Sequence, residues 1–274
     1  MYRLANLRKV FEGHLVAVDD VSLKIDVGEQ VAVIGPSGAG KTTLFRLLNL
    51  TLRPDGGALW LGDLDVSELR GRALRATRRR IGTIYQQHNL VPRLPVVHNA
   101  LAGRLGAWSA WRAVWSLLRP QELEVAYAAL SQVGIPEKLY ARTDDLSGGQ
   151  QQRVAIARVL LQDPDVILAD EPVASVDPSL AHAIVKLLVE ISQTSGKTLV
   201  MNLHSVDLAL TYFPRVIGFR EGRIQFDRPP VELTEEDLTH LYADVSRSEA
   251  QEAGVHADHD SSFTSSCGPL FPRK

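Results

Sequence analysis

The segment Gly35-Pro-Ser-Gly-Ala-Gly-Lys-Thr42 says more about this chain than any other stretch of its sequence. It follows the apolar run 31–34 and leads into residues 43–50, whose leucines recur at helical spacing. A buried strand, a glycine loop and a helix N-terminus form the context in which the pattern G-x-x-x-x-G-K-S/T indicates a phosphate cradle. We therefore predict a nucleoside triphosphate site at this turn.

Each position of this segment has a chemical reason. Glycines let the backbone turn its N–H groups toward an anion, and the open helix end adds partial positive charge. Lys41 supplies a mobile charge for the β- and γ-phosphates, and Thr42 supplies a hydroxyl for Mg²⁺. The predicted nucleotide contacts are Gly35, Pro36, Ser37, Gly38, Ala39, Gly40, Lys41, Thr42 and Thr43.

The composition is that of an ordinary globular protein. The 274 residues, 45% of them hydrophobic and 23% charged, suffice for one large α/β domain or two small ones. With a net charge of −2 the chain has no global basic field, so no nucleic-acid partner is expected. The single cysteine, Cys267, excludes an intramolecular disulfide and fits a reducing compartment.

Neither an export signal nor a membrane span is predicted. Residues 1–9 lack the long apolar core of a signal peptide. No window approaches the roughly 20 apolar residues that a membrane-spanning helix needs. We expect a cytosolic protein, or one that docks on a membrane protein that does the spanning.

The rest of the chain alternates between strand and helix patterns. Strands are predicted at 3–10, 16–26, 31–34, 58–62, 81–85, 166–169 and 198–203, and a hairpin at 215–220 and 223–227. Helices are predicted from an N-cap at Ser67 to about residue 80, over much of 95–160, and at 179–193 and 205–212. This alternation implies a mainly parallel sheet covered on both faces. From about residue 243 the composition becomes polar and serine-rich, which is typical of a disordered tail.

Two carboxylates follow the apolar run 166–169. A strand of this kind presents Asp170 at its carboxyl end, where the ligand sites of α/β sheets lie. We expect Asp170 to bind Mg²⁺, directly or through water, and Glu171 to polarise the attacking water as a general base. The alternative is a pair of solvated acids, and the upstream phosphate loop argues against it.

A second glycine-rich turn, Leu146-Ser-Gly-Gly-Gln150, precedes a sequence with a clear apolar helical face. Ser147 and the paired glycines therefore open a second anion-binding helix N-terminus. One nucleotide has one γ-phosphate, so two such helix ends on one chain suggest that two chains share two nucleotides. An ordinary Ser-Gly-Gly loop is the alternative. The glutamine-rich continuation and the acidic pair at 170–171 argue against that reading.

In combination these motifs resemble those of the nucleotide-binding subunit of an ABC transporter, over roughly residues 1–243. The resemblance implies an α/β fold of the P-loop NTPase type, with a RecA-like core and a mainly parallel sheet. It also implies an N-terminal antiparallel β subdomain, an inserted helical subdomain at about 88–160, and a disordered tail at 244–274. ATP and Mg²⁺ are the implied cofactors, and ATP hydrolysis is the implied reaction.

The same resemblance assigns roles to single residues. Phe11 matches the aromatic that stacks on adenine, Gln86 the glutamine of the Q-loop, and His204 the switch histidine. The segment 175–177, which ends in Asp177, matches the D-loop.

These assignments give three groups of site residues. The catalytic residues are Glu171, His204 and Gln86. The Mg²⁺ ligands are Thr42, Gln86 and Asp170. The signature residues, which contact the ATP bound by the other subunit, are Ser147, Gly148, Gly149 and Gln150.

Several further stretches are similar to the ATPase subunit of phosphonate importers, a group with relatives that import phosphite. They are residues 99–106, an insertion with Trp108, Trp111 and Trp115, and the stretches 203–209 and 226–234. Ser205 departs from the pattern, which often has glutamine after the histidine. The resemblance implies import of phosphonate or a related phosphorus oxyanion. The alternative is a soluble ABC-type ATPase that assists phosphonate breakdown.

Import implies a set of partners. A homodimer of ATPase subunits binds two transmembrane permease subunits, and an external solute-binding protein delivers the cargo. The chain would then be a peripheral protein on the cytoplasmic face of the inner membrane.

Three other features leave alternatives open. The tryptophans at 108, 111 and 115 recur on one helical face, and they either pack within the helical subdomain or receive a permease helix. The arginines at 70, 72, 75, 78, 79 and 80 favour a solvated helix face over an anion patch. His256 and His259 resemble a metal tract only weakly.

Overall fold

The computed structural model describes residues 1–174 and 176–243, and the chain forms two compact units, Met1–Leu233 and Thr234–Lys274. In the second unit the described element is helix α9 (Glu235–Tyr242), where Thr234 and Asp237 form a reciprocal capping box. All other elements belong to the first unit. The domain extents expected from the sequence, 1–243 and 244–274, stay predictions. The tail for which disorder was predicted, with Cys267, His256 and His259, lies outside the described residues.

The N-terminal strands form an antiparallel sheet in the order β2-β1-β4-β5. Its strands are β1 (Tyr2–Phe11), β2 (Leu15–Ile25), β4 (Gly56–Leu61) and β5 (Leu64–Asp65). Burial alternates along much of β1 and β2, which places one face of the sheet against the core. The predicted antiparallel β subdomain is thereby confirmed.

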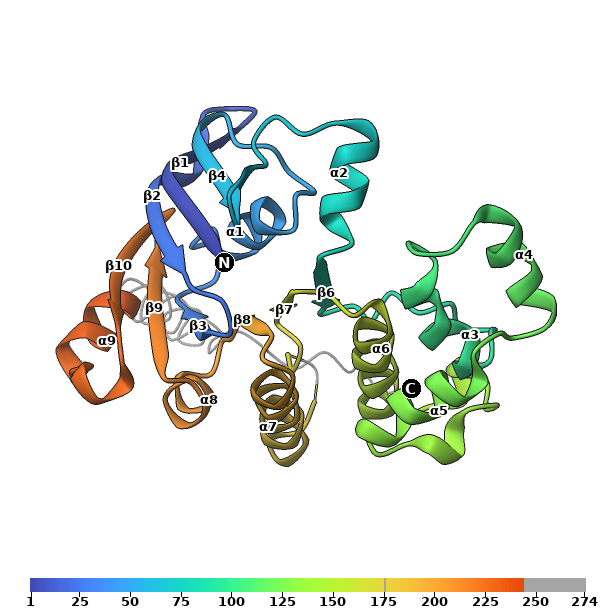
Figure 1. The fold of residues 1–274 in the computed structure, drawn as a ribbon. Helices are drawn as coiled ribbons and strands as arrows, with labels where there is room; N and C mark the ends of the chain where they lie inside the picture. The colour runs from blue at the N-terminus through green and yellow to red at the C-terminus, as the bar shows by residue number, and fades with distance from the viewer. Residues whose placement is uncertain (175, 244–274) are drawn as a thin grey trace, which may run out of the picture. The chain divides into compact units, whose positions relative to one another are not determined.

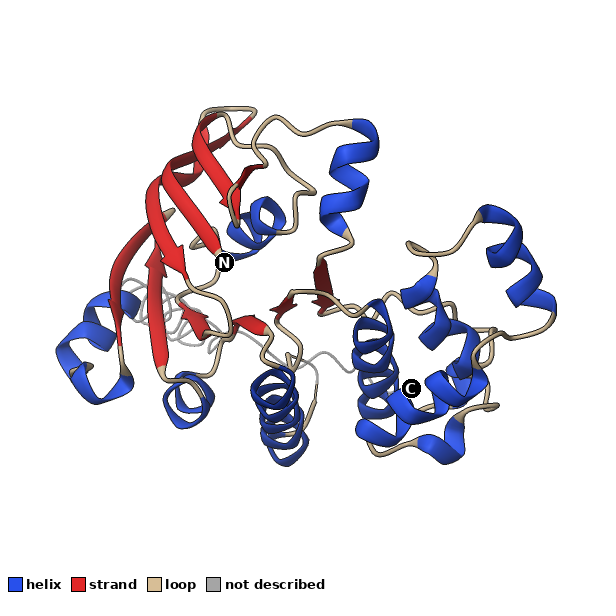
Figure 2. Cartoon of the chain, viewed as in Figure 1, coloured by secondary structure: helices blue, strands red, loops and turns tan. Residues whose placement is uncertain are grey.

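A second sheet of six strands carries the phosphate loop, in the order β10-β9-β3-β8-β7-β6 (Figures 1 and 2). Its strands are β3 (Gln30–Ile34), β6 (Ile81–Tyr85), β7 (Val166–Asp170), β8 (Thr198–Asn202), β9 (Arg215–Arg220) and β10 (Arg223–Arg228). Neighbours run parallel except β10, which pairs with β9 as a hairpin. Every residue of β3 and β8 is buried, as a sheet covered on both faces requires.

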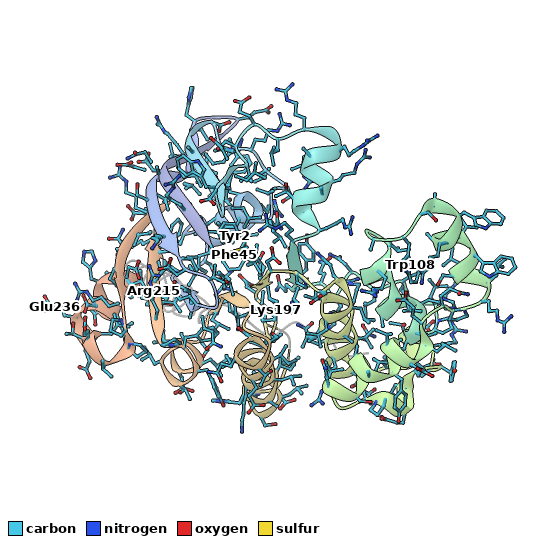
Figure 3. The ribbon with its side chains drawn as sticks, viewed as in Figure 1. Tyr2, Phe45, Trp108, Lys197, Arg215 and Glu236 are labelled. Carbon is cyan, nitrogen blue, oxygen red and sulfur yellow. The ribbon has the colours of Figure 1, made fainter. Side chains whose placement is uncertain are left out.

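Helix α1 (Lys41–Leu48) lies between the two sheets and joins their cores (Figure 1). Its apolar side chains belong to one buried cluster that also contains residues of β1, β2, β3, β7 and β9. Figure 3 shows Tyr2 beside Phe45, and the Tyr2 hydroxyl donates to the Leu48 carbonyl oxygen at 2.8 Å. This packing fixes the direction in which α1 leaves the phosphate loop.

The remaining helices cover the parallel sheet or form the insertion. Helices α7 (Pro178–Ser195) and α8 (Val206–Tyr212) lie on the face opposite α1 (Figure 2). The insertion follows β6, and α3 and α5 pack on α6, which also reaches β6. The inserted helical subdomain is thereby confirmed. Its helices are α3 (Val96–Leu101), α4 (Ala110–Leu118), α5 (Leu123–Gln132) and α6 (Gly148–Gln162), with short 3₁₀ turns at Ala102–Arg104, Pro136–Lys138 and Thr143–Asp145.

The arginine-rich helix starts later than predicted. Helix α2 (Gly71–Arg78) has Arg70 at its N-cap, and no side chain caps it. Ser67, the predicted cap, instead accepts a hydrogen bond from the Leu59 N–H at 2.8 Å, so its hydroxyl is engaged with β4. The predicted solvated face is confirmed, because the arginines from 70 to 80 are all exposed.

The three tryptophans do not share one helical face, contrary to the prediction. Trp108 precedes α4, whereas Trp111 and Trp115 lie on it. Trp111 is 76% exposed and Trp115 is 48% exposed, so packing within the helical subdomain is wrong for both. Trp108 is half-buried, and the Arg112 guanidinium lies 5.0 Å from its ring centroid.

Candidate nucleotide-binding site

The phosphate loop connects β3 to α1, and its glycines allow close backbone approaches. Gly40 has a φ of +100°, and a Cβ there would lie 2.1 Å from the Ala17 carbonyl oxygen. At Gly35 a Cβ would lie 1.9 Å from the Phe219 carbonyl oxygen. A side chain at either position would force the loop away from the neighbouring strands. The loop therefore keeps its N–H groups at the head of α1, the anion-binding end of the helix.

Lys41 is folded back over the loop from the first turn of α1. Its Nζ donates to the Gly35 carbonyl oxygen at 2.7 Å and to the Pro36 carbonyl oxygen at 2.8 Å. The residue is only 4% exposed, and burial lowers the pKa of its ammonium group, while Glu171 and Asp170 oppose that shift. A phosphate oxygen entering the loop would exchange these neutral acceptors for an anion, which favours the charged amine.

A cavity of about 610 Å³ opens in front of the loop. Its volume is in the range of small-molecule sites. Phe11 and residues 15–17 of β2 line one part of it, and Glu171 and His204 another. The predicted nucleotide contacts in its wall are Phe11, Ser37, Gly38, Ala39, Gly40, Lys41, Thr42 and Thr43.

A second cavity of about 620 Å³ shares Ser37, Glu171 and His204 with the first. It adds Gln86, from the segment after β6, and Asn202, the last residue of β8. The structure therefore brings together the predicted Q-loop, catalytic and phosphate-loop residues, which are far apart in the sequence.

Asp170 ends β7 and lies level with Asn202 of the neighbouring parallel strand. The Asn202 Nδ2 donates to Asp170 Oδ1 at 2.7 Å. Burial raises the pKa of the Asp170 carboxyl; the Asn202 hydrogen bond opposes this, and the Glu171 charge adds to it. Asn202 Oδ1 is buried and has no hydrogen-bond partner among the described residues. This end of the sheet therefore holds a carboxylate that a bound cation would stabilise.

Glu171 follows the strand in a strained conformation, with a φ of +51°. A non-glycine residue in this region costs about 1–3 kcal/mol and is found preferentially at functional sites. Its N–H donates to the Asn202 carbonyl oxygen at 3.2 Å, and its Oε1 lies 2.7 Å from His204 Nε2. The Glu171 carboxylate therefore lies beside the end of β8, in contact with the His204 ring.

The glycine turn at 147–150 is the N-terminus of α6, as predicted. Ser147 Oγ accepts from the Gln150 N–H at 3.3 Å, and Gln150 Oε1 accepts from the Ser147 N–H at 3.1 Å, a reciprocal capping box. Gly148 is exposed, and a Cβ on Gly149 would lie 2.3 Å from Leu180 Cδ2. Among the described residues that line the two cavities, none comes from this turn. Within one chain the signature therefore stands apart from the phosphate loop.

Asp177 is the N-cap of α7. Its Oδ1 accepts from the Ser179 hydroxyl at 2.6 Å and from the Leu180 N–H at 3.0 Å. The Ser179 hydroxyl is the main cause that lowers the pKa of the Asp177 carboxyl. Ser175, the first residue of the predicted D-loop, lies outside the described residues.

Two residues of this region escaped prediction. Asn202 donates a hydrogen bond to Asp170. The sequence feature that could have identified it is a polar residue at the end of an otherwise apolar strand. His88 lies two residues after Gln86, and its Nε2 is 3.0 Å from the Gly148 carbonyl oxygen. That contact joins the segment after Gln86 to the signature, and the sequence gives no signal for it.

Among the described residues, no cluster of three or more His, Cys, Asp or Glu side chains could hold a metal ion alone. None of the described helices combines the length and the apolar character that crossing a bilayer requires.

Residues 18–174 match the profile of the ABC transporter family. The chain is 44% identical over 245 residues to the phosphonates import ATP-binding protein PhnC 1 of Rhodopseudomonas palustris strain HaA2, covering 89% of this chain and 87% of that protein. It is 47% identical over 231 residues to PhnC of Pseudomonas putida, covering 84% and 86%.

Solved structures agree with these relatives. The dimeric structure of the bacterial ABC transporter cassette MJ0796 is similar, with a TM-score of 0.72, 30% identity, and coverage of 84% of this chain and 99% of that one. The cbiO1 structure from Clostridium perfringens, part of the cbiONQ transporter complex, has a TM-score of 0.75, 26% identity, and coverage of 92% and 98%.

Proposed function

Because the chain belongs to the ABC transporter family and is an ATPase, we propose that it powers an importer of phosphonate or a related phosphorus oxyanion. The cargo is inferred from the relatives, which are named phosphonate import ATP-binding proteins. In this proposal the membrane-spanning permease is a separate protein, and ATP binding and hydrolysis on this chain drive its changes of shape.

One observation carries the proposal: the signature turn at the head of α6 lies outside the cavities that contain the phosphate loop. The N-termini of α1 and α6 can each bind an anion. Within one chain, however, they do not line the same cavity, so they cannot both contact one nucleotide. A second copy arranged head to tail would place its Ser147, Gly148 and Gly149 over the triphosphate held by Lys41. The solved MJ0796 cassette is dimeric, which supports the arrangement.

Catalysis follows from the side chains at the ends of β7 and β8. Glu171 and His204 both line the cavity beside the phosphate loop. With ATP bound, the His204 ring would hydrogen-bond the γ-phosphate instead of Glu171, and the Glu171 carboxylate would then accept a proton from an attacking water. Gln86 shares their cavity and would sense whether a phosphate is present. Phe11 would stack on adenine, and its wall of the cavity is apolar through Leu15, Val16 and Ala17.

Mg²⁺ fits the oxygen donors of this site. Thr42, Gln86 and Asp170 would hold the ion, and hard oxygen ligands are those that Mg²⁺ prefers. The buried, unpartnered Asn202 Oδ1 beside Asp170 offers an acceptor for a metal-bound water. When bound, the ion would neutralise the charge of the phosphates.

The proposed assembly contains two copies of this chain, two permease subunits and an external solute-binding protein, and it lies on the cytoplasmic face of the inner membrane. To test it, cells lacking the gene would be complemented with the wild-type chain or with Glu171→Gln, and phosphonate or phosphite supplied as sole phosphorus source. We expect growth only with the wild type, and a permease that copurifies with both chains in detergent. Growth independent of the gene would contradict the import role, and copurification of soluble enzymes alone would favour phosphonate breakdown.

A further inference from the structure

Helix α4 (Ala110–Leu118) displays its apolar side chains instead of burying them. Trp111 is 76% exposed and Leu118 is 78% exposed, and Val114, Trp115 and Leu117 are also exposed. Among the described residues of this helix, only Ser116 is buried. Figure 1 shows α4 at the margin of the helical subdomain, on the side away from the strands. Contiguous exposed apolar surface of this kind indicates a binding face.

Four of these five exposed apolar residues form one stripe. Residues 111, 114, 115 and 118 are spaced i, i+3, i+4 and i+7, so they lie along one side of the helix over about 10 Å. The helix is short, and polar contacts hold it. Ser109 caps its N-terminus, and Glu122 pairs with both Arg104 at 3.0 Å and Arg112 at 2.5 Å. These ion pairs hold α4 in place without burying its apolar face.

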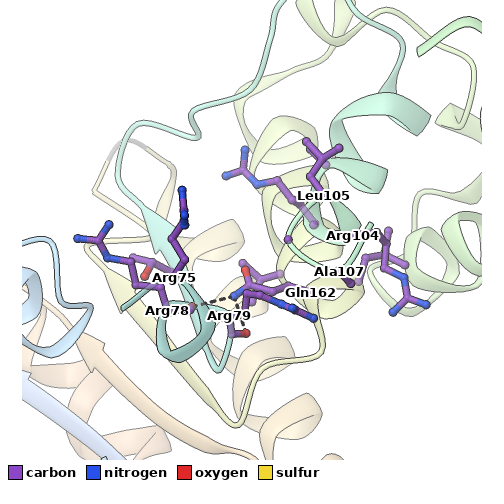
Figure 4. Close-up of a pocket in the computed structure, with 14 residues that line it drawn as sticks. Arg75, Arg78, Arg79, Arg104, Leu105, Ala107 and Gln162 are labelled. Atoms are coloured by element: carbon purple, nitrogen blue, oxygen red, sulfur yellow. Dashed lines mark hydrogen bonds between the residues drawn. The ribbon is translucent and has the colours of Figure 1, made fainter. Parts of the chain in front are cut away.

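The surroundings of the stripe are positively charged. Residues 93–124 contain four arginines, at 93, 104, 112 and 119, against two acids, Glu122 and Glu124, and Glu122 pairs with Arg104 and Arg112. Leu105 and Ala107, which lead into α4, line a cavity of about 510 Å³ (Figure 4). None of the described residues that line this cavity is acidic, and its arginines are Arg75, Arg78, Arg79, Arg104 and Arg158.

The apolar stripe and the nearby arginines together indicate the chemistry of the binding partner. An exposed stripe of tryptophan, valine and leucine needs either a protein with a matching groove or the apolar interior of a membrane, and nearby arginines suit an anionic partner. A helix of this length cannot span a bilayer, but an amphipathic helix with tryptophans on one side and arginines beside them lies in the bilayer interface. We propose that α4 inserts its stripe into the surface of an anionic lipid bilayer, with the nearby arginines against the headgroup phosphates.

This inference goes beyond the proposed function, and its test needs neither ATP hydrolysis nor a permease. Purified full-length chain would be mixed with vesicles of phosphatidylcholine alone or with equal parts of phosphatidylglycerol, and bound protein separated by sedimentation. We expect binding to the anionic vesicles at least about tenfold stronger than to the neutral ones, weakened by salt. Vesicles whose acyl chains are brominated near the headgroups should quench the tryptophan fluorescence, because Trp111 and Trp115 would lie at the boundary between the headgroups and the acyl chains.

Two matched variants distinguish binding through the stripe from non-specific hydrophobic adsorption. Trp111→Ser combined with Leu118→Ser should lower binding at least about tenfold, since both side chains supply buried apolar area. Val27→Ser should leave binding unchanged, because Val27 is equally exposed, at 76%, on the turn between β2 and β3. Both variants should keep the wild-type ATPase rate and circular dichroism, which shows that they fold.

Three results would overturn the inference. The first is no binding of the wild type to anionic vesicles, and the second is equal binding by the double variant. The third is nucleotide-free self-association that the double variant abolishes, because the stripe would then be covered by a second copy of the chain.

Discussion

Glu171 Oε1 lies 2.7 Å from His204 Nε2, although the two are 33 positions apart in the sequence. The strands that end just before them, β7 and β8, are parallel neighbours, so their carboxyl ends meet. The Glu171 side chain is 16% exposed and that of His204 is 45% exposed, so both can be reached from the cavity beside the phosphate loop. In the proposed mechanism, an attacking water and the γ-phosphate lie beside these two side chains.

Replacing Glu171 by Gln should nearly abolish turnover while leaving ATP binding intact. The amide keeps the shape of the side chain but accepts a proton poorly, and loss of a general base costs about 10²–10⁴-fold in rate. Phosphate release and ATP titration would measure the two properties separately. Glu12→Gln is the control, since Glu12 is exposed in the turn between β1 and β2. A wild-type rate in Glu171→Gln would remove it from the role of base.

Lys41→Ala should weaken ATP binding by about tenfold or more, because a charged hydrogen bond is worth roughly 1.5–3 kcal/mol. In the wild type, the Lys41 ammonium lies 2.7 and 2.8 Å from two carbonyl oxygens of the loop that we propose binds the phosphates. Isothermal titration calorimetry would give the dissociation constant. Lys186→Ala, on the exposed side of α7, should bind ATP like the wild type. An unchanged constant for Lys41→Ala would contradict the phosphate role.

Asp170→Asn should raise the thermal stability of the nucleotide-free protein at neutral pH. Burial raises the pKa of Asp170 above its unfolded value, so the folded chain holds that proton more tightly. Stability then falls as pH rises from the unfolded pKa through the folded one, and the penalty is fully present above that window.

We expect a gain in Tm at pH 7.5 that shrinks toward acid pH, where the wild-type carboxyl is protonated as well. Differential scanning fluorimetry across pH would measure it, with the exposed Asp63→Asn as control. A gain in Tm that stayed the same at acid pH would show that the ionised carboxylate is not the cause.

Gly40→Ala should destabilise the protein and impair ATP binding, because its Cβ would lie 2.1 Å from the Ala17 carbonyl oxygen. Gly62→Ala is the matched control: its φ is also positive, at +64°, but a Cβ there meets nothing within 4 Å. The control should cost only the conformational penalty, about 1–2 kcal/mol, and should keep ATP affinity. Urea unfolding would compare the two variants, and equal losses would mean that the close approach to Ala17 is unimportant.

The sequence predicted those parts of the fold whose signals are local. The apolar runs at 31–34 and 166–169 are followed by a glycine loop and by two acids, so they identify strands β3 and β7. They also indicate that the candidate site lies at the carboxyl ends of these strands. The predicted helix start at Ser67 was wrong, because a serine hydroxyl can either cap a helix or accept a hydrogen bond from a neighbouring strand. Only the tertiary structure decides between the two. The same limit applies to Trp111, since helical periodicity shows which residues share a face but not what covers that face.

Light scattering on Glu171→Gln would show whether two chains bind ATP between them. With saturating ATP and Mg²⁺, this hydrolysis-deficient variant should have twice the mass of one chain. The double variant Glu171→Gln with Ser147→Arg should stay at the mass of one chain while still binding ATP, because Ser147 belongs to the turn at the head of α6 and not to the cavity. A strictly monomeric Glu171→Gln variant, or dimerisation unaffected by Ser147→Arg, would contradict the account.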